Sequence, residues 1–317
     1  MKEIEKMKEM KKTPAASLTA FEAYLHEQDC SILTVRGYLA DLEHFALWFN
    51  QTNAKALSPE RLTPTDVKAY KQHLLVVERR KASTVNRRLA ALSAYARWAL
   101  VTGQIHSDPT LHVKSVKQVV NSPKWLDKQE QFALQRAIER DLQLSKLRYP
   151  KRWVTRRRDA SLTLFLLNTG LRLGELIAMR LGDVQISERK GSLLVQNGKG
   201  GKQRAIPLNV EARKALQQWL DIRPTTDSDF VWTGVEGTSA DLSGRAIQRI
   251  LERYAQEAGL EELTPHTCRH TFAKNLVNQG VGLEKVAALL GHANLNTTRL
   301  YVTPDARDLE LAVEKLN

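Results

Sequence analysis

The sequence predicts a mostly helical protein with a small β-sheet in its second half. The first third of the chain repeats apolar residues at helical spacing, in segments joined by short polar loops. The second half adds two short runs of strand-type residues, SLLVQ and QRAIPL, on either side of the glycine-rich stretch NGKGGK. That pattern is typical of a β-hairpin. We therefore expect a helical domain followed by a mixed α/β domain.

Composition narrows the classes of protein to which the chain can belong. Its 317 residues suggest about two domains, and a hydrophobic share of 42% is sufficient for packed cores. The formal net charge is +13, and basic residues outnumber acidic ones both in the first 120 residues and in the remainder. This excess favours a polyanion contacted by both domains over a basic tail on a neutral enzyme.

The sequence also bears on the compartment. Cys30 and Cys268 form neither a disulfide framework nor a zinc-binding pattern, which predicts a reducing, cytoplasmic setting. No run of about 18 apolar residues occurs, so we expect no membrane partner. The start, MKEIEKMKEMKK, lacks the apolar segment of a signal peptide. We interpret residues 1–13 as a charged, solvated extension.

Helical signals continue through residues 14–106, which we expect to form one small domain. Its third helix is predicted to start either at Thr63, followed by Pro64, or at Thr65. Ser83 is the candidate N-cap of the fourth helix, and Gly103 ends that helix. The short loops between these segments predict a compact bundle.

Residues 107–125 contain two prolines, several lysines and little periodicity, as an interdomain linker would. The second domain is predicted to span residues 126–317, including a C-terminal tail over residues 302–317. Asp127, followed three residues later by Glu130, predicts a capped helix at its start.

Several polar residues of the second domain are candidates for chemistry. In TGLRLGEL, Arg172 and Glu175 are three residues apart and share a helical face. They could form a surface salt bridge of little consequence, or a carboxylate-held guanidinium that binds phosphate. Lys199 lies in the glycine-rich loop of the hairpin, either as an exposed turn residue or as an ammonium delivered to a phosphate.

The stretch HTCRHTFA carries a second cluster. Its helix would begin after Thr264, which places His266 and Arg269 in the first turns, where anions are favoured. His266 and His270 are spaced like metal ligands. We nevertheless expect no metal, because HExxH and a suitably spaced third ligand are absent. Each residue alone is compatible with an ordinary structural role.

Taken in order, these residues resemble the tyrosine recombinases of the phage-integrase family, and in particular Xer-like site-specific recombinases. The motifs are TGLRLGEL, GKGGKQRAIPL, HTCRHTFA and LLGHANLNTTRLY, with nine residues from His292 to Tyr301. The stretches FEAYLHEQDCSILTVRGYLADLEHF and STVNRRLAALSAYARWALVTGQIHSDPT resemble the core-binding domain of that family. The resemblance covers about residues 16 to 303. It implies a helical, SAM-like core-binding domain and a mixed α/β catalytic domain that close on DNA as a C-shaped clamp.

The resemblance also implies a mechanism. Tyr301 would attack a scissile phosphate, form a 3′-phosphotyrosyl link and free a 5′-hydroxyl. Lys199 would protonate the leaving oxygen, and His266 would assist proton transfer at the tyrosine. The phosphate itself would be held by Arg172, Arg269 and His292. Glu175 would orient this network from behind. Because the covalent link conserves the phosphodiester energy, neither ATP nor another cofactor is required.

The expected partners follow from the same resemblance. They are a double-stranded DNA recombination site, a homotetramer assembled on two such sites with a Holliday-junction intermediate, and accessory DNA-bending proteins. The tail would dock on a neighbouring protomer or on its own domain. The candidate DNA contacts are two basic groups, namely Arg79, Arg80, Lys81, Arg87 and Arg88, and Arg156, Arg157 and Arg158.

Other functions compete with this interpretation. A type IB topoisomerase would use similar chemistry without strand exchange, and a DNA-binding regulator would bind without a covalent adduct. A metal nuclease would need a carboxylate cluster, which the sequence lacks. The residues after Tyr301 and the N-terminal extension depart from cellular Xer recombinases, which favours integration, excision or resolution of a mobile element or replicon.

Overall fold

The computed structural model describes residues 16–118, 123–196, 203–235, 242–292, 294–301 and 313. The chain divides into two compact units, Met1–Val120 and Asn121–Asn317. Each unit has its own hydrophobic core. The charged extension predicted over residues 1–13 lies outside the described residues.

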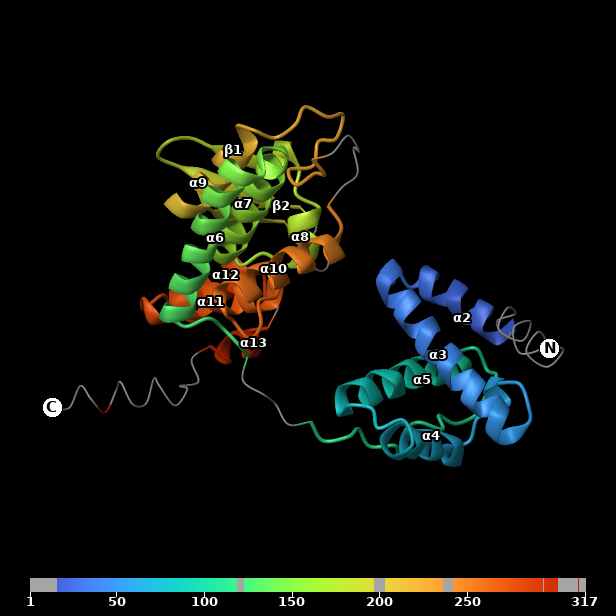
Figure 1. Cartoon of the computed structure of the whole chain (residues 1–317). Coiled ribbons are helices and arrows are strands. Elements are labelled where there is room, and N and C mark those ends of the chain that lie inside the picture. Colours follow the sequence, from blue (N-terminus) through green and yellow to red (C-terminus); the bar gives the residue numbers. More distant parts are fainter. Residues whose placement is uncertain are drawn as a thin grey trace. The chain divides into compact units, whose positions relative to one another are not determined.

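The first unit is a helical bundle (Figure 1). Thr63, one of the two predicted candidates, caps its third helix and forms a capping box with Asp66. The Ser83 prediction is wrong. The last helix begins at Ala82, directly after extended Lys81, so Ser83 lies inside the first turn. The helices are α2 (Ala16–Glu27), α3 (Ile32–Asn53), α4 (Pro64–Val76) and α5 (Ala82–Val101).

Aromatic side chains fill the core of this bundle. Phe45 of α3 packs edge-on against Tyr70 of α4, with ring centroids 4.8 Å apart. Phe21 of α2 does the same with Tyr95 of α5, at 5.5 Å. Such pairs add to the free energy gained by burying the rings.

The second unit is mixed, which confirms the predicted fold class. The sequence places Asp127 as the cap of the first helix, and its capping box with Glu130 is present. The helices are α6 (Lys128–Arg148), α7 (Trp153–Thr169), α8 (Leu173–Ile177), α9 (Val210–Leu220), α10 (Gly244–Ala258), α11 (Pro265–Asn278), α12 (Leu283–Leu290) and α13 (Asn296–Arg299), with short 3-10 turns at Pro150–Arg152 and Leu181–Asp183.

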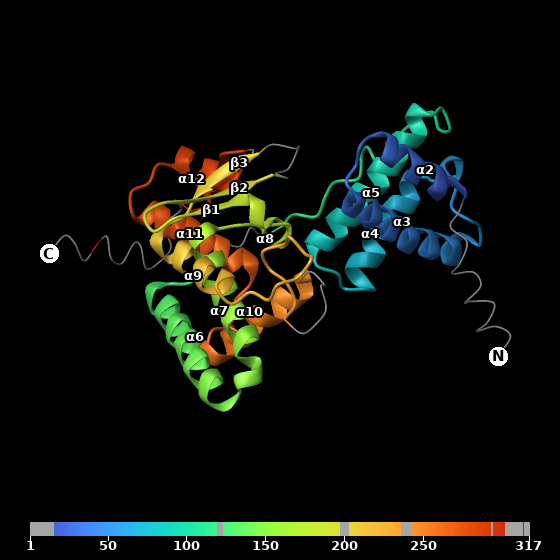
Figure 2. The same cartoon turned by 90° about the horizontal axis from the view of Figure 1, so that it is seen from above.

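The predicted hairpin is present within a three-stranded antiparallel sheet of order β1-β2-β3. Strands β2 (Gly191–Val195) and β3 (Arg204–Pro207) pair so that Val195 faces Arg204. Strand β1 (Val184–Ile186) was not predicted, because three residues are too few to reveal an alternating pattern. Figure 2 shows the three strands side by side, with α12 next to β3.

Helix α7 lies at the centre of this unit. Its segment SLTLFLLNT is apolar on most sides, and α6, α9 and α11 pack against it. A helix that is apolar nearly all round is expected in a core rather than at a surface. Its C-terminal end leads directly into α8, which carries the first residues of the candidate site. No helix among the described residues is long and apolar enough to cross a membrane.

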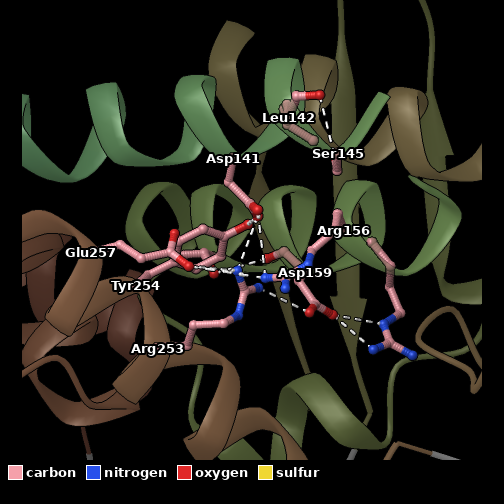
Figure 3. Close-up of polar contacts among 10 residues, drawn as sticks. Asp141, Leu142, Ser145, Arg156, Asp159, Arg253, Tyr254 and Glu257 are labelled. Atoms are coloured by element: carbon pink, nitrogen blue, oxygen red, sulfur yellow. Dashed lines mark hydrogen bonds and ion pairs between the residues drawn. The ribbon is translucent and has the colours of Figure 1, made fainter. Parts of the chain in front are cut away.

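An ion network joins α6, α7 and α10 (Figure 3). Arg253 of α10 donates to Asp141 of α6 at 3.0 Å and to Asp159 of α7 at 3.1 Å. The hydroxyl of Tyr254 donates to Asp141 at 3.0 Å. We call this group the interhelical network. Its charged members are Asp141, Asp159, Glu257, Arg156, Arg158 and Arg253.

The interhelical network contains arginines for which the sequence predicts contacts with DNA. Arg158, predicted to contact DNA, is buried, and its guanidinium donates to Asp159 and to the carbonyl of Thr233. Arg156 is paired with Asp141 at 3.5 Å. Arg157 donates to Gln218 at 3.2 Å. The run of three arginines therefore does not form one basic surface, because its members point to different partners.

Candidate active site

The first candidate residues lie where α7 passes into α8. Gly170 ends α7 with φ of 62°, and a Cβ there would lie 2.5 Å from the ring of Phe272. Glycine is required for both reasons. The next turn begins at Arg172, whose Nη1 donates to Glu175 Oε1 at 2.8 Å and whose backbone N–H donates to Oε2 at 2.9 Å. The predicted pair is therefore formed.

Glu175 is also bound by an arginine that the sequence interpretation missed. Arg204, the first residue of β3, donates from Nη1 to Oε1 at 2.9 Å and from Nη2 to Oε2 at 2.8 Å. Burial acts to raise the pKa of Glu175. The hydrogen bonds from Arg204 and Arg172 outweigh burial and bring that pKa to about 2. Glu175 is therefore ionised at neutral pH.

A signal for Arg204 was present in the sequence. Arg204 and Ile206 are two residues apart in a strand and therefore share a face. Ile206 is fully buried, so the face that carries Arg204 points toward the core. A charged residue on the apolar face of a strand needs a buried partner. That requirement could have indicated the ion pair with Glu175.

Arg269 is the second predicted arginine and is almost wholly buried. Its helix, α11, begins with Thr264 as N-cap and Pro265 at the first position, as predicted. The side chain is 4% exposed, and it donates to the carbonyls of Gly170 at 2.8 Å and Leu290 at 2.7 Å. Burial and the nearby Arg172 lower the pKa of Arg269 to about 10, so it remains a cation at neutral pH.

Tyr301 follows α13 and is 1% exposed. Its Oη lies 2.7 Å from His270 Nδ1. Burial raises the pKa of Tyr301, whereas the fields of Arg269 and Arg172 act in the opposite direction. The same two arginines also act on His292, whose ring stacks on Tyr301 with centroids 6.5 Å apart.

Both histidines beside Tyr301 are neutral at pH 7. Burial, together with the charges of His266 and Arg269, lowers the pKa of His270 to about 4. Burial and the nearby arginines lower the pKa of His292 to about 4 as well. A neutral imidazole keeps one nitrogen free to accept a proton. His270 can therefore accept the hydrogen bond of the Tyr301 phenol.

Some of the predicted site residues lie together in the structure, and others do not. Arg172, Glu175, Arg269, His292 and Tyr301 are brought together, but His266 is exposed and stacks on His270 at 6.3 Å. The sequence interpretation considered His270 only as a metal ligand. Its position next to Arg269, four residues after His266, does not by itself distinguish the two histidines. Lys199 and most of the tail lie outside the described residues.

The described site carries more positive than negative charge. Arg172, Arg204 and Arg269 surround a single carboxylate, that of Glu175. Such a surplus favours an anion, and the planar guanidinium groups suit phosphate. With a tyrosine hydroxyl beside them, the residues can bind a phosphate and direct a nucleophile at it. Among the described residues, no group of three or more His, Cys, Asp and Glu side chains could hold a metal ion.

The predicted DNA contacts of the first unit include both exposed and buried residues. Arg79, Arg80, Lys81 and Arg87 are exposed. Arg80 pairs with Glu78, and Arg87 pairs with Asp41. Arg88 is buried between the same two carboxylates and does not belong to the exposed basic group, so its contact with DNA stays a prediction.

Comparisons with known proteins identify the family of the chain. A model described as the phage integrase family matches residues 143–307, and one described as the phage integrase N-terminal SAM-like domain matches residues 18–104. The chain is 34% identical over 274 residues to the tyrosine recombinase XerC of Corynebacterium efficiens, which covers 84% of this chain and 80% of that protein. It is 30% identical over 292 residues to XerD of Listeria monocytogenes, covering 88% and 92% respectively.

Solved structures share the fold at lower identity. The XerH recombinase bound to its palindromic difH substrate matches with a TM-score of 0.72 and 22% identity, over 94% of this chain and 84% of that one. A lambda integrase dimer bound to a COC′ core site matches with a TM-score of 0.69 and 19% identity, over 92% and 96%.

Proposed function

We propose that this chain, which belongs to the phage integrase family and is a Xer-like tyrosine recombinase, cleaves and rejoins specific DNA sites through Tyr301. The observation that carries the proposal is the position of this tyrosine. It is buried in the field of Arg269 and Arg172, whose positive charge the described carboxylate only partly neutralises.

In the proposed reaction, Arg172 and Arg269 hold the non-bridging oxygens of the scissile phosphate. Oη of Tyr301 attacks phosphorus, the bond from phosphorus to the 5′-oxygen breaks, and a 3′-phosphotyrosyl link forms. The phenol gives up its proton in this step, and the 5′-oxygen takes one up. The 5′-hydroxyl of a partner strand then reverses the reaction. Donors fixed in advance around the developing charge are a large source of rate enhancement.

Protons need an acceptor and a donor in this scheme. We assign the acceptor role in the free protein to His270, because its neutral Nδ1 lies 2.7 Å from the phenol oxygen. The role predicted for His266 stays a prediction, since that side chain is exposed and stacks on His270 instead. Lys199 remains the proposed proton donor to the 5′-oxygen. His292 remains a proposed donor to the phosphate.

DNA is the proposed partner. The XerH structure holds a difH site, and a lambda integrase tetramer with the same fold, at a TM-score of 0.67, is bound to a Holliday junction. By analogy we propose that four protomers assemble on two recombination sites, with the helical unit and the catalytic unit closing on the duplex. Accessory DNA-bending proteins, and docking of the tail over residues 302–317, are further elements of this proposal.

Covalent capture of DNA tests the reaction. Protein is incubated in EDTA with duplexes that carry randomised sequence and a nick near every candidate cleavage point, so that the cleaved end diffuses away. After denaturation in SDS, DNA attached to protein is isolated and sequenced, which also identifies the site. Tyr301→Phe is the matched control. We expect an adduct with wild type and none with the variant.

The outcomes separate the competing functions. An adduct that survives in Tyr301→Phe would exclude Tyr301 as the nucleophile. An adduct followed by relaxation of supercoiled DNA, without exchange between two sites, would indicate a topoisomerase. Specific binding without any adduct would indicate a DNA-binding regulator. Recombinant products between two copies of the captured site would establish strand exchange.

A further inference from the structure

We propose that Arg204 is a positioning residue of the recombination site, which fixes Arg172 and the turn before His292 without contacting the DNA phosphate. This inference rests on the proposed function and adds a residue that the sequence motifs did not indicate. It is drawn from three sets of contacts around Arg204.

In the first set, each carboxylate oxygen of Glu175 accepts two hydrogen bonds. Oε1 accepts from Nη1 of both Arg172 and Arg204, at 2.8 Å and 2.9 Å. Oε2 accepts from the backbone of Arg172 at 2.9 Å and from Nη2 of Arg204 at 2.8 Å. Two parallel N–H donors from one guanidinium fix the plane of a carboxylate. Arg204 therefore sets the orientation in which Glu175 holds Arg172.

The second set lies at the C-terminal end of α12. Three consecutive carbonyls there each accept from a different arginine. Leu289 O accepts from Arg204 Nε at 3.0 Å, Leu290 O from Arg269 at 2.7 Å, and Gly291 O from Arg172 at 2.8 Å. The last carbonyls of a helix lack partners within the helix and carry partial negative charge, so they attract cations. The end of α12 thus fixes the spacing of all three guanidinium groups.

The third set is a close approach at Gly291. This glycine has φ of 66°, and a Cβ there would lie 2.8 Å from Arg204 Nη1. Arg204 therefore packs directly on the backbone that precedes His292. A displaced Arg204 side chain would leave this turn unsupported.

Exposure distinguishes the roles of the two arginines. The side chain of Arg172 is 36% exposed, whereas that of Arg204 is 14% exposed and uses Nε, Nη1 and Nη2 on protein acceptors. Arg172 keeps surface for a phosphate. Arg204 is committed to Glu175 and to the end of α12, which is the arrangement of a supporting residue. Arg269 is also buried, but it donates to the neutral carbonyls of Gly170 and Leu290, so its charge stays available to a phosphate, whereas the charge of Arg204 is paired with the carboxylate of Glu175.

The test compares Arg204→Lys and Arg204→Ala with Arg253→Ala in the full chain. Lysine keeps the charge but loses the fork, so it isolates geometry from charge. Arg253→Ala also removes a partly buried arginine, which pairs with three carboxylates in the interhelical network. The readout is the rate of adduct formation on the captured DNA site, per folded molecule that binds DNA.

We expect both Arg204 variants to form the adduct about 10- to 100-fold more slowly than wild type, and Arg253→Ala to react at the wild-type rate. In protein that already carries Glu175→Gln, adding Arg204→Ala should slow adduct formation much less than it does in wild type, because the two residues act as one unit. Rates within about twofold of wild type for Arg204→Lys and Arg204→Ala would overturn the inference. No adduct with wild type would overturn the proposed function and this inference with it.

A second substrate separates positioning of the phosphate from help to the leaving group. A 5′-bridging phosphorothioate has a sulfur leaving group that needs no proton, so it should rescue Lys199→Ala. The Arg204 variants should stay slow on this substrate, like Arg269→Ala. Rescue of the Arg204 variants to the wild-type rate would contradict the inference, because it would show that Arg204 acts through the hairpin that carries the proton donor.

Discussion

Two groups of charged residues in the catalytic unit look alike in composition but differ in balance. The interhelical network pairs three arginines with three carboxylates across α6, α7 and α10 (Figure 3). The described active site holds three arginines and one carboxylate, which pairs with Arg172 and Arg204, whereas Arg269 donates to carbonyls. Burying charge is unfavourable unless it is compensated. A balanced group therefore holds helices together, whereas a group with surplus positive charge is suited to an anion from outside.

The two buried tyrosines of these groups show the same contrast. Burial raises the pKa of both Tyr254 and Tyr301. Tyr254 donates to the carboxylate of Asp141, which opposes loss of its proton. Tyr301 bonds to the neutral imidazole of His270 and lies in the field of two arginines. Arg253 also acts to lower the pKa of Tyr254, so the two tyrosines differ in the charge of the hydrogen-bond acceptor. A carboxylate disfavours the phenolate, whereas a neutral imidazole does not.

The largest expected effect comes from removing an arginine of the site. Arg269→Ala should slow adduct formation about 10²- to 10³-fold, because the variant has no fixed donor to the transition state at this position. Arg253→Ala removes an arginine of the balanced group and should leave the rate per folded molecule unchanged. Single-turnover cleavage of the nicked duplex measures both. Equal decreases in the two variants would break the distinction between the two groups.

For the free energy of unfolding, we expect the substitution in the interhelical network to have the larger effect and the substitution in the active site to have the smaller one. Arg253→Met leaves Asp141 and Asp159 without their shared partner and should lower the free energy of unfolding by about 3 kcal/mol. This is the lower end of the usual cost, because Arg253 is 24% exposed. Tyr301→Phe removes one hydrogen bond and should cost about 1 kcal/mol. Urea denaturation measures both values, and a greater decrease in Tyr301→Phe would contradict the assignment.

Much of this arrangement could be predicted from local sequence. The capping box at Asp127 and the cap at Thr264 were predicted correctly, and the cap at Thr63 was one of two candidates, because capping depends on residues three positions apart. The β-hairpin was predicted because its signal is also local. Arg172, Glu175 and Tyr301 were singled out by their order along the chain, through resemblance to a family.

Contacts between distant segments could not be predicted in this way. Arg204 and Glu175 are 29 residues apart, and Arg158 bonds a carbonyl 75 residues away. The same sequence features that suggest a basic surface at Arg88 and Arg158 are compatible with buried ion pairs. Only packing decides between them, because carboxylates and carbonyls from distant segments complete these pairs. The choice of His270 over His266 as the partner of Tyr301 likewise depends on where α13 places the phenol.

The histidines predict how stability depends on pH. The folded chain holds His270 and His292 neutral with pKa values of about 4, whereas the reference value is 6.5. Between these values the unfolded chain binds more protons, so stability should fall as the pH drops from about 6.5 to about 4. His270→Asn should reduce this slope. Melting temperatures across this range test the prediction, and a slope in His270→Asn equal to that of wild type would contradict it.

The smallest expected effect extends the comparison to the first unit. There Arg88 is buried in ion pairs, whereas Arg79 and Lys81 are exposed. Removing one side chain that binds a phosphate should reduce the log–log salt slope of DNA binding by about 0.9. Arg79→Asn with Lys81→Gln should therefore reduce the slope by up to about 1.8, and asparagine tolerates the left-handed backbone at position 79, where φ is 49°.

Arg88→Met is the matched control for that measurement. It should lower the free energy of unfolding, because it leaves Asp41 and Glu78 without a buried partner, and it should leave the salt slope unchanged. Fluorescence anisotropy of a labelled duplex at several salt concentrations gives the slope. A slope that falls in Arg88→Met but not in the double variant would mean that DNA binding opens the ion pairs of Arg88. In that case the pairing of arginines with carboxylates in the free protein would not identify the arginines that bind DNA.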